Sequence, residues 1–470
     1  MTHDPSHADA SRPLWGSRVR AGLTPVALAL SSSTTEDRPL APYDVEASRA
    51  HLGELERLGL LDAAGRQRLD DALGSVAEAI ADGTFAWSEE HEDVHMNVEA
   101  AVRAAAGPEL AGQLQAGRSR NEEVVTDERR WLIDAVERLD AAVRSLQATL
   151  LDRAEEHVDT VVPAHTHTQP AQPTLLAHHF LAHVEMLERD RGRLADAADR
   201  ANASPAGSGA AVGSGLPLDR EAVAARLGFA TITRNSLDAV ADRDYAVELT
   251  AACAMAMVHL SRLAADFVAW STPYYRFARI GDGHATGSSM LPHKRNPDVA
   301  ELVRGRAARA QADLHAVLAV QSGLPLGYHR DLQETRAPMQ RAVADLELCL
   351  AAIDGMVRDT AFDVAAMDAA ARGGHALATA LAERLLRAGV PFRDAHWRIG
   401  ELVAEAEAAG CDVTELPADR LRSALPEIAD HDPIVPTLAE ALAAADLPGG
   451  TAPNRVRAAL ADARERIATR

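Results

Sequence analysis

The strongest hydrophobic pattern along the chain is a series of apolar residues separated by alternating steps of four and three positions. Its members are Leu132, Val136, Leu139, Val143, Leu146 and Leu150. Because neither glycine nor proline interrupts the segment until Pro163, this heptad spacing predicts one helix over about residues 122–158. With a rise of about 1.5 Å per residue, the helix would be roughly 50 Å long. Such a helix exceeds one compact core, so we expect a bundle of long helices shared between subunits.

Four more long helical segments follow, at about residues 174–201, 237–272, 297–320 and 331–357. The loops between them are rich in glycine, proline and serine. Loops held by a rigid scaffold are where binding and catalytic residues are usually found. We therefore look for chemistry in the loops at the ends of these helices.

The pattern changes on both sides of this central part. The segment up to about residue 115 is hydrophilic, and SSSTTEDRPLAPYD predicts a loop with capping residues before a helix over VEASRAHLGELERLGLL. Beyond about residue 362 the helical segments shorten, and proline and glycine become more frequent. We predict an all-α fold with four parts. These are a disordered tail at 1–13, a helical N-terminal domain at 14–115, a central long-helix bundle domain at 116–362 and a helical C-terminal domain at 363–470.

Composition narrows the possible partners. Aromatic residues are only 4% of the chain and alanine is abundant, which favours close-packed helices. The formal net charge of −21 argues against nucleic acid and anionic membrane surfaces, because both attract a basic footprint. A small anionic substrate stays compatible, since a local basic pocket can lie inside an acidic protein. The polar N-terminus, without a cationic start or an apolar span, predicts a cytoplasmic protein with no membrane segment.

No feature of the sequence predicts a metal or another cofactor. Cys253, Cys349 and Cys411 are far apart and odd in number, so we interpret them as reduced, small apolar residues. His165 and His167 in AHTHTQPAQPT have an H-x-H spacing, but no third ligand is apparent and carboxylates do not cluster there. A histidine in this loop is suited to moving a proton near neutral pH.

One loop contains the only lysine of the chain. Lys294 lies in GSSMLPHKRNPD, and every other residue among the 48 lysine and arginine side chains is arginine. An ammonium is a compact point charge and a guanidinium a planar fork, so a site shaped for one need not accept the other. With the hydroxyl of Ser288 and the amide of Asn296, Lys294 fits acid–base chemistry on an anion. A solvated loop lysine is the simpler alternative.

Two further segments carry candidate binding residues. EEHEDVHMNVE places His95 among carboxylates. GRSRNEEVVTDERRW begins the long helix with Arg118, Arg120 and Asn121, and arginines at a helix N-terminus suit a bound carboxylate. A solvated helix face and surface ion pairing are the alternatives for these segments. Arg243, among the aspartates of NSLDAVADRDYAVE, is interpreted as structural.

In combination, these segments resemble the argininosuccinate lyase branch of the fumarase/aspartase superfamily. The matching stretches, in the family's order from about residue 14 to 345, are LWGSR, EDVHMNVE, GRSRNEEVVTDERRW, THTQPAQP, GSGAAVGSGLPLDR, NSLDAVADRDYAVE, GSSMLPHKRNPD and GLPLGYHRDLQE. The resemblance implies a mostly helical homotetramer with a central bundle of long helices from four subunits. It also implies active sites assembled from loops of three chains, without a cofactor or a metal.

The reaction that the resemblance implies is a β-elimination from an N-substituted aspartate, which releases an amine and leaves fumarate. Argininosuccinate, giving arginine, is the default substrate. Ser288 matches the family's base, and Lys294 and Asn296 match the groups that hold the carboxylate and its doubly charged aci form. His167 matches the histidine considered for protonating the leaving nitrogen, and Glu301 lies at the position of its carboxylate partner.

The same matching assigns residues to substrate binding. The half of the substrate that becomes fumarate would be bound by Thr166, Asn121, Arg120 and Ser289. The rest of the pocket would be lined by His95, Tyr328, Gln333, Ser33 and Asp37, the last two nearest the amine end. Arg336 stands where the branch has a substrate-binding lysine.

The chain also departs from the branch. It reads THTQPAQP where the branch usually reads THLQRAQP, LPHKRNP for MPQKKNP, and Ser31 for an asparagine. The changes beside His167 and at Arg336 lie on the leaving-group side, and the sequence leaves open whether they alter specificity. Two alternatives follow. One is the same reaction on a different amine adduct, as in ethylenediaminedisuccinate-type lyases. The other is a non-catalytic, crystallin-like structural homologue.

Overall fold

The structure, a computed structural model, describes residues 23–469 and is all-α apart from three two-stranded sheets within that range. The motif LWGSR and the predicted tail at 1–13 lie outside the described residues. Five long helices dominate: α7 (Arg120–Glu156), α8 (Leu176–Ala201), α11 (Asp244–Trp270), α12 (Asp298–Gln321) and α13 (Arg336–Asp359). The predicted all-α class with long central helices is therefore confirmed.

The chain forms two compact units, and each long helix contributes residues to both. The first unit, which we call unit 1, comprises residues up to 135, 197–249 and 316–339. Besides ends of long helices, it contains α1 (Pro25–Ser31), α2 (Thr34–Asp37), η1 (Arg38–Leu40), α3 (Ala41–Arg57), α4 (Ala63–Ala81), α5 (Val94–Ala106), α6 (Pro108–Ala111), β3 (Ala203–Ser204), α9 (Arg220–Arg226), β4 (Thr231–Ile232), α10 (Ser236–Ala241) and η3 (Arg330–Thr335).

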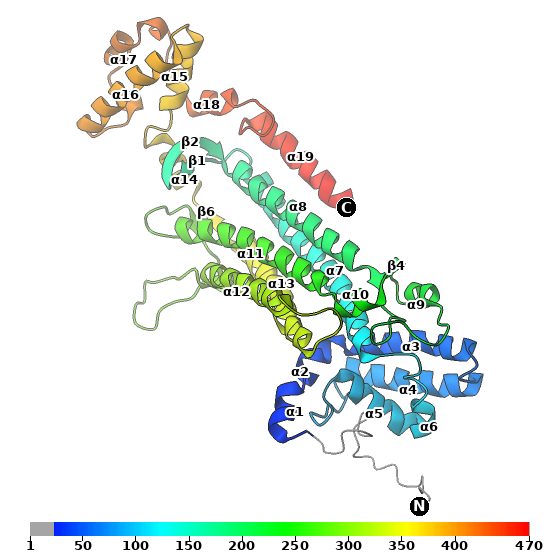
Figure 1. Cartoon of the computed structure of the whole chain (residues 1–470). Coiled ribbons are helices and arrows are strands. Elements are labelled where there is room, and N and C mark those ends of the chain that lie inside the picture. The colour runs from blue at the N-terminus through cyan, green and yellow to red at the C-terminus, as the bar shows by residue number, and fades with distance from the viewer. Residues whose placement is uncertain (1–22, 470) are drawn as a thin grey trace, which may run out of the picture. The chain divides into compact units, whose positions relative to one another are not determined.

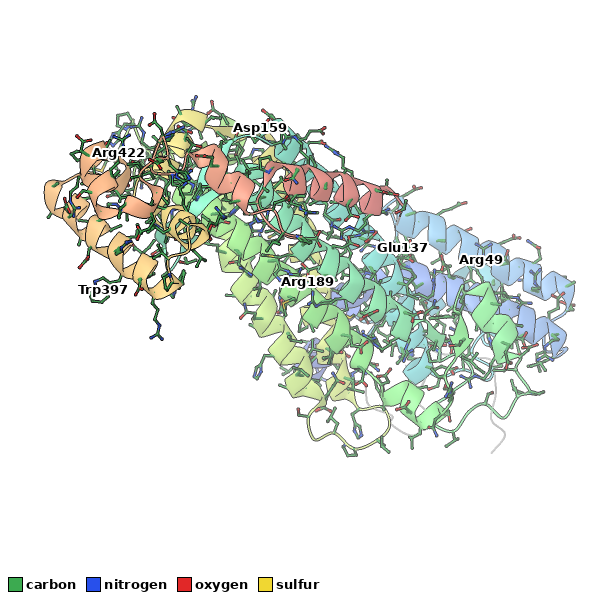
Figure 2. The ribbon with its side chains drawn as sticks, turned by 90° about the horizontal axis from the view of Figure 1, so that it is seen from above. Arg49, Glu137, Asp159, Arg189, Trp397 and Arg422 are labelled. Carbon is green, nitrogen blue, oxygen red and sulfur yellow. The ribbon has the colours of Figure 1, made fainter. Side chains whose placement is uncertain are left out.

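The core of unit 1 lies between α3, α4 and α5, which run side by side (Figure 1). Leu52 and Leu55 of α3 meet Leu69 and Leu73 of α4, and all four side chains are buried. Across the outer surface of the same two helices, Arg49 Nε pairs with an Asp70 carboxylate oxygen at 2.8 Å, and Figure 2 labels Arg49 on this face. This packing fixes the position of α5, which carries His95.

Unit 2 comprises residues 136–196, 250–315 and 340–470. Besides parts of the long helices, it contains β1 (Val161–Thr166), β2 (Gln169–Leu175), β5 (Ala278–Arg279), η2 (Asp282–His284), β6 (Ala361–Phe362), α14 (Val364–Arg372), α15 (Ala378–Arg387), α16 (Phe392–Ala409), η4 (Val413–Glu415), α17 (Ala418–Ala424), η5 (Pro426–Ile428), α18 (Leu438–Ala444) and α19 (Pro453–Thr469). The helices α15, α16 and α17 gather around a separate apolar core (Figure 1). Both units take segments from the predicted central domain, so the division at residues 115 and 362 stays a prediction.

The predicted apolar seam of α7 is buried within the chain itself. All six of its residues are at most 6% exposed. Gln147, on the same helix, donates to the Val184 carbonyl of α8, and Ser145 donates to Asp354 of α13 at 2.8 Å. The chain's own helices thus bury the seam. Its burial does not require the expected packing against helices of other subunits.

Three local predictions differ from the structure. The expected loop over SSSTTEDRPLAPYD is largely helical, because α2, η1 and the start of α3 occupy it. The expected helix over 237–272 is two helices. Asp242 ends α10, and its carboxylate accepts the N–H of Asp244 at 2.7 Å, which caps α11. The start of the expected helix over 331–357 is the tighter helix η3.

The loop AHTHTQPAQPT is also more regular than expected, since it forms an antiparallel hairpin of β1 and β2. In a two-stranded hairpin each strand keeps one unpaired edge, so the prolines of β2 cost few ladder hydrogen bonds. His167 and Thr168 form the tip with φ values of 53° and 60°, in the left-handed region that non-glycine residues rarely adopt. The hairpin therefore holds His167 at an exposed, conformationally constrained tip.

One helix in the described range, α11, is long and apolar enough to cross a membrane by length and composition alone. Of its most apolar window, 56% is buried inside the protein, which is the behaviour of a core helix of a bundle. The sequence analysis expected no membrane segment, and α11 is the one described helix whose length and composition would fit one. Cys253 and Cys349 are buried, and all three cysteines are free, as the sequence predicted.

Candidate active site

Unit 1 contains a cavity of about 140 Å³ where most of the predicted binding residues meet. Eight of them line it: Ser33, Asp37, His95, Arg120, Asn121, Tyr328, Gln333 and Arg336. They come from α2, α5, α7, η3, α13 and the segments beside them, so residues from Ser33 to Arg336 converge here. A polar pocket with several cations is suited to a small anionic ligand.

Local structure explains how His95 reaches this cavity. The carboxylate of Asp93 accepts the N–H of Met96 at 2.8 Å and so caps α5. This cap begins the helix at Val94 and places His95 in the first turn, where it is buried. The second carboxylate oxygen of Asp93 lies 3.2 Å from Arg120 Nη1, which ties α5 to the start of α7.

His95 is a fixed cation. Burial disfavours its charged form, but the Asp44 carboxylate, 2.8 Å from Nδ1, together with Asp93 and Asp127, raises the pKa of His95 to about 10. Burial also opposes ionisation of Asp44, yet the ion pair with His95 and the charges of Arg118 and Arg120 lower the pKa of Asp44. The pair therefore stays ionised across the physiological range, and the cavity keeps one imidazolium.

Arg336 is held by carboxylates of the protein. Its Nη1 pairs with Asp37, and its Nε lies 2.7 Å from Glu128 Oε1. Glu128 also pairs with the fully buried Arg243 at 3.2 Å and accepts the hydroxyl of Tyr245. Arg243 is thus structural, as its sequence context predicted. Because both neighbours of Arg336 are anionic, its charge is already compensated before any ligand binds.

Ser33 and Gln333 complete the same side of the cavity. The Ser33 hydroxyl donates to Asp37 at 2.6 Å, and Gln333 Nε2 lies 3.5 Å from the Ser31 carbonyl. Asp37 therefore joins Ser33 to Arg336. This wall combines a hydroxyl, an amide and a carboxylate, which can recognise a cationic or hydrogen-bonding group.

Arg118, proposed with Arg120 and Asn121 as a carboxylate site, is not among the residues that line this cavity. Its Nε lies 2.9 Å from Glu123, and Nη1 donates to Ser48 at 3.0 Å. Asn121 lines the cavity, and its Nδ2 donates to the Ala210 carbonyl at 3.0 Å. Of the three residues at the start of α7, only Arg120 and Asn121 are therefore available to a ligand.

Three further residues line the cavity that sequence reasoning missed: Asp93, Val124 and Arg330. Asp93 and Arg330 lie inside two of the motifs that carry the family resemblance, EDVHMNVE and GLPLGYHRDLQE. Arg330 donates to the Ser31 carbonyl at 2.5 Å and lies 3.7 Å from Glu92. The two motifs could therefore have indicated Asp93 and Arg330. Spacing within a motif does not show which of its charged residues face the cavity.

The other predicted residues belong to unit 2, where they lie on exposed segments. Ser288, Ser289, Lys294 and Asn296 occupy the loop between η2 and α12, which an isolated bridge between Thr286 and Asn296 closes. Ser289 and Lys294 are exposed, and no ion pair to Lys294 is found among the described residues. Glu301, in the first turn of α12, is also exposed.

The hydroxyl of Ser288 accepts two hydrogen bonds within its own loop. Its Oγ accepts the backbone N–H of Leu291 at 3.0 Å and that of Met290 at 3.3 Å. Donors aimed at an oxygen stabilise its anionic form. Asn296 Nδ2 lies 3.4 Å from the Gly287 carbonyl, so the amide is anchored in the same loop.

Thr166 and His167 are exposed at the hairpin tip. No hydrogen bond or ion pair among residues 23–469 joins His167 to Lys294 or Glu301. Unit 2 by itself thus presents the predicted catalytic groups on open loops, whereas unit 1 presents a formed pocket.

Comparison with known families covers most of the chain. Residues 28–312 match the family described as Lyase, and residues 375–445 match Argininosuccinate lyase C-terminal. The chain is 44% identical over 454 residues to a curated argininosuccinate lyase of Desulforudis audaxviator (strain MP104C), an alignment that covers 97% of this chain and 99% of the relative.

Solved structures share the fold. An EDDS lyase variant with bound fumarate superposes with a TM-score of 0.82 and 26% identity, over 96% of this chain and 92% of its own. A class II fumarase of Schistosoma mansoni superposes with a TM-score of 0.74 over 87% of this chain and 92% of its own. At 16% identity, the fumarase supports the fold alone.

Proposed function

The chain belongs to the argininosuccinate lyase branch of the fumarate lyase superfamily, and from this premise we propose that it cleaves argininosuccinate into arginine and fumarate in the cytoplasm. The enzyme is a fumarate-releasing carbon–nitrogen lyase. The observation that carries the choice of substrate is the 44% identity over 97% of the chain to a curated argininosuccinate lyase. The EDDS lyase neighbour has 26% identity, so its substrate class has weaker support.

Proton abstraction is the difficult step of this reaction, because the carbon beside a carboxylate is a weak acid. Ser288 is the proposed base. The two backbone N–H groups that donate to its Oγ support this role, since they stabilise the alkoxide form. The C–H pair of electrons moves into the carboxylate, which becomes the doubly charged aci form.

Lys294 and Asn296 are proposed to hold that carboxylate. A primary ammonium and an amide N–H donor neutralise the second negative charge as it develops, so they stabilise the transition state more than the ground state. Thr166, Ser289, Asn121 and Arg120 would bind the rest of the fumarate-forming half. The imidazolium of His95 lines the same pocket, with its charge already paired with Asp44.

Departure of the amine completes the elimination. The electrons of the aci form return to make the carbon–carbon double bond, the carbon–nitrogen bond breaks, and the leaving nitrogen takes a proton. His167, paired with Glu301, is the proposed source of that proton, directly or through water. Neither the base nor the acid requires a metal or a cofactor in this scheme.

We further propose a homotetramer in which three subunits contribute to each active site. Large apolar side chains support it, because Met255 on α11, Leu302 on α12 and Leu348 on α13 are 41%, 65% and 54% exposed in the single chain. Exposed apolar residues on three neighbouring long helices suit a helix-bundle interface. The open position of the Lys294 loop and of the His167 tip is also explained if other subunits cover them.

The leaving-group end favours a second candidate, the same elimination on another amine adduct. Arg336 stands where the branch has a substrate-binding lysine, and Asp37 and Glu128 already pair with it. Thr168 and Pro170 differ beside His167. Arg336 lines the pocket of unit 1, and Thr168 and Pro170 flank the proposed acid His167, so these changes would bear on specificity for the amine and leave the elimination itself unchanged.

A substrate panel separates the candidates. The purified chain is incubated with argininosuccinate, with ethylenediaminedisuccinate and with adenylosuccinate, and fumarate is followed by its ultraviolet absorbance. We expect kcat/KM for argininosuccinate to exceed that for the other two by at least about 10³-fold, the scale on which a polar pocket rejects a mismatched ligand. Fumarate from the disuccinyl diamine alone would establish the second candidate, and no fumarate from any substrate would favour a crystallin-like homologue.

A further inference from the structure

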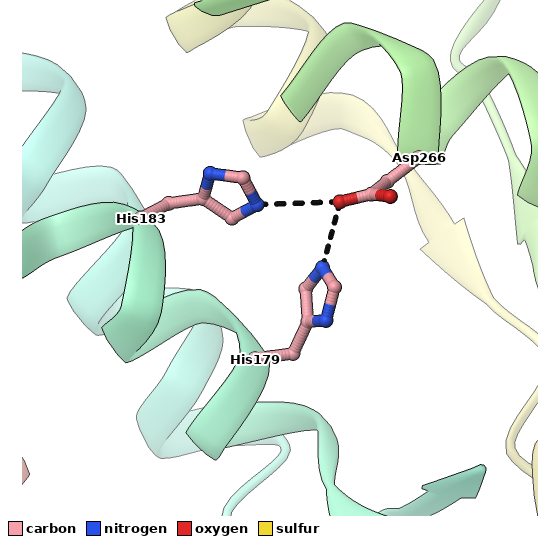
Figure 3. Close-up of side chains that lie close together, drawn as sticks. All are labelled: His179, His183 and Asp266. Atoms are coloured by element: carbon pink, nitrogen blue, oxygen red, sulfur yellow. Dashed lines mark hydrogen bonds and ion pairs between the residues drawn. The ribbon is translucent and has the colours of Figure 1, made fainter. Parts of the chain in front are cut away.

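Three side chains that the proposed elimination does not use converge between α8 and α11 in unit 2 (Figure 3). His179 and His183 are four positions apart on α8, so both rings project from one face of the helix. Asp266 approaches from α11. Its Oδ2 lies 2.9 Å from His179 Nε2 and 3.3 Å from His183 Nε2. All three ligand atoms therefore lie within 4.8 Å of one another.

We propose that His179, His183 and Asp266 bind one divalent transition-metal ion of the zinc and cobalt class, with water completing the coordination. Two imidazoles at i and i+4 with a carboxylate from a second element are a three-ligand set that transition metals use in proteins. Nitrogen ligands favour these ions over Mg²⁺ and Ca²⁺, which prefer oxygen alone. This site is independent of the proposed reaction.

The distances are close to those that an ion requires. Ligand bonds of about 2.0–2.2 Å in a tetrahedral site put the ligand atoms roughly 3.3 Å apart. The separation between His183 Nε2 and Asp266 Oδ2 already has this value, 3.3 Å. The separation for His179, 2.9 Å, has to widen by only a few tenths of an ångström. A small rotation of a partly exposed ring supplies that change.

The three proposed ligands differ in their exposure to solvent. The His183 side chain is 6% exposed, whereas those of His179 and Asp266 are 31% and 35% exposed. The buried ring fixes the ligand geometry, and the exposed pair gives an ion and its water a path from solvent. The indole of Trp270 packs 4.8 Å from the ring of His179, which adds an apolar neighbour to the site.

A hydrogen-bonded trio is the competing explanation. In that arrangement each neutral histidine donates its Nε2–H to the same oxygen of Asp266. To bind an ion, each ring must carry its proton on Nδ1 instead, which is a change of tautomer and releases no proton. Metal binding and the trio are therefore alternatives for the same three side chains, and a titration distinguishes them.

The test uses the full-length protein, freed of metal with a chelator and titrated with Co²⁺. We expect one Co²⁺ per chain, a visible absorption band of a nitrogen-ligated ion, and quenching of Trp270 fluorescence that Zn²⁺ reverses by displacement. The quenching should disappear in Trp270→Phe while the absorption band remains. Absence of saturable binding in the wild-type chain would overturn the proposal.

Variants localise the ion. His183→Asn and Asp266→Asn should each weaken Co²⁺ binding by at least about tenfold, the lower end of the effect of disturbing the groups around a metal. His178→Asn is the matched control, since His178 is adjacent on α8 and outside the trio, and its binding should match wild type. If His183→Asn does not fold, the partly exposed His179→Asn gives the same comparison. Undiminished binding in the folded variants would also overturn the proposal.

Discussion

At the scale of single residues, His95 and Lys294 place positive charge in opposite surroundings. His95 is buried beside Asp44, and the carboxylates around it keep the imidazole charged. Lys294 lies on an exposed loop, and its chemistry depends on what closes over it. The sequence indicated both residues through motifs, but only the structure shows that one charge is preorganised within a single chain.

The lone lysine leads to the first prediction. If an ammonium is required to hold the aci carboxylate, Lys294→Arg should lower kcat by about 10²–10³-fold, the typical cost of removing one oxyanion donor. The oligomeric state should not change, because the proposed interface depends on apolar side chains of α11, α12 and α13, and Lys294 is not among them. Steady-state kinetics and size-exclusion chromatography measure the two effects.

Arg295→Lys is the matched control for this loop. Arg295 pairs with Asp282 at 2.6 Å, with both side chains exposed, so the exchange should leave kcat within about twofold. Wild-type turnover in Lys294→Arg would show that a guanidinium serves equally well, and the proposed role of the ammonium would be wrong.

His95 gives a prediction about stability and pH. Its pKa of about 10 in the folded protein lies above the ordinary 6.5, so its stabilisation is complete below about pH 6.5 and is lost as pH rises through about 10. The unfolding midpoint of the wild type should therefore fall between pH 7 and 10. His95→Asn should lose this slope, and removing one member of a buried pair costs about 3–5 kcal/mol.

The double variant His95→Asn/Asp44→Asn provides the control. It removes both charges, so it should recover part of the stability that His95→Asn loses by leaving Asp44 buried and unpaired. Thermal unfolding followed by circular dichroism at several pH values measures all three proteins. An equal pH slope in wild type and His95→Asn would contradict the assigned ion pair.

At the scale of elements, the helical periodicity was the most reliable guide. The helices predicted over 122–158, 174–201 and 297–320 occur as α7, α8 and α12 within about two residues at each end. Periodicity reports which face of a helix is buried, and a long apolar stripe determines that face without other information. It does not report what buries the face, so the seam of α7 alone does not distinguish packing within the chain from packing between subunits.

The misassigned elements share a physical cause, because short-range contacts decided them. Asp242 separates α10 from α11 by ending one helix and capping the next, and the buried Arg243 donates to the carbonyls of Val240 and Asp242 in the gap. Because aspartate is a common capping residue, Asp242 could have indicated the break between the two helices. The apolar residues on both sides of it favoured the prediction of one continuous helix. The hairpin at His167 likewise depends on pairing between two polar, proline-rich segments, which propensity does not favour.

At the scale of the whole molecule, each unit by itself carries part of the predicted site. Unit 1 holds the pocket with His95, Arg120 and Asn121, and unit 2 carries Lys294 and His167 on exposed loops. The proposed sharing of each site between subunits would explain why the proposed catalytic loops of one chain are open. This arrangement can be tested without a structure of the assembly.

Subunit mixing provides that test. Arg120→Gln and Lys294→Arg should each be nearly inactive alone, because each loses one group of the site. If the two residues of one site come from different subunits, co-expression in equal amounts should give hybrid tetramers with about a quarter of the wild-type activity per site. Activity no higher than that of the single variants would show that both residues act from one chain.

Taken alone, the sequence determined the helical class, the boundaries of α7, α8 and α12 and the chemical groups available to a site. These depend on local periodicity and on side-chain type, which are readable along the chain. Tertiary structure decided which charges face a common cavity, which are compensated, as in Arg336 with Asp37 and Glu128, and which histidines meet Asp266. The physical reason is that pairing and pKa depend on distance and burial between residues far apart in the chain, and spacing along the sequence does not encode those quantities.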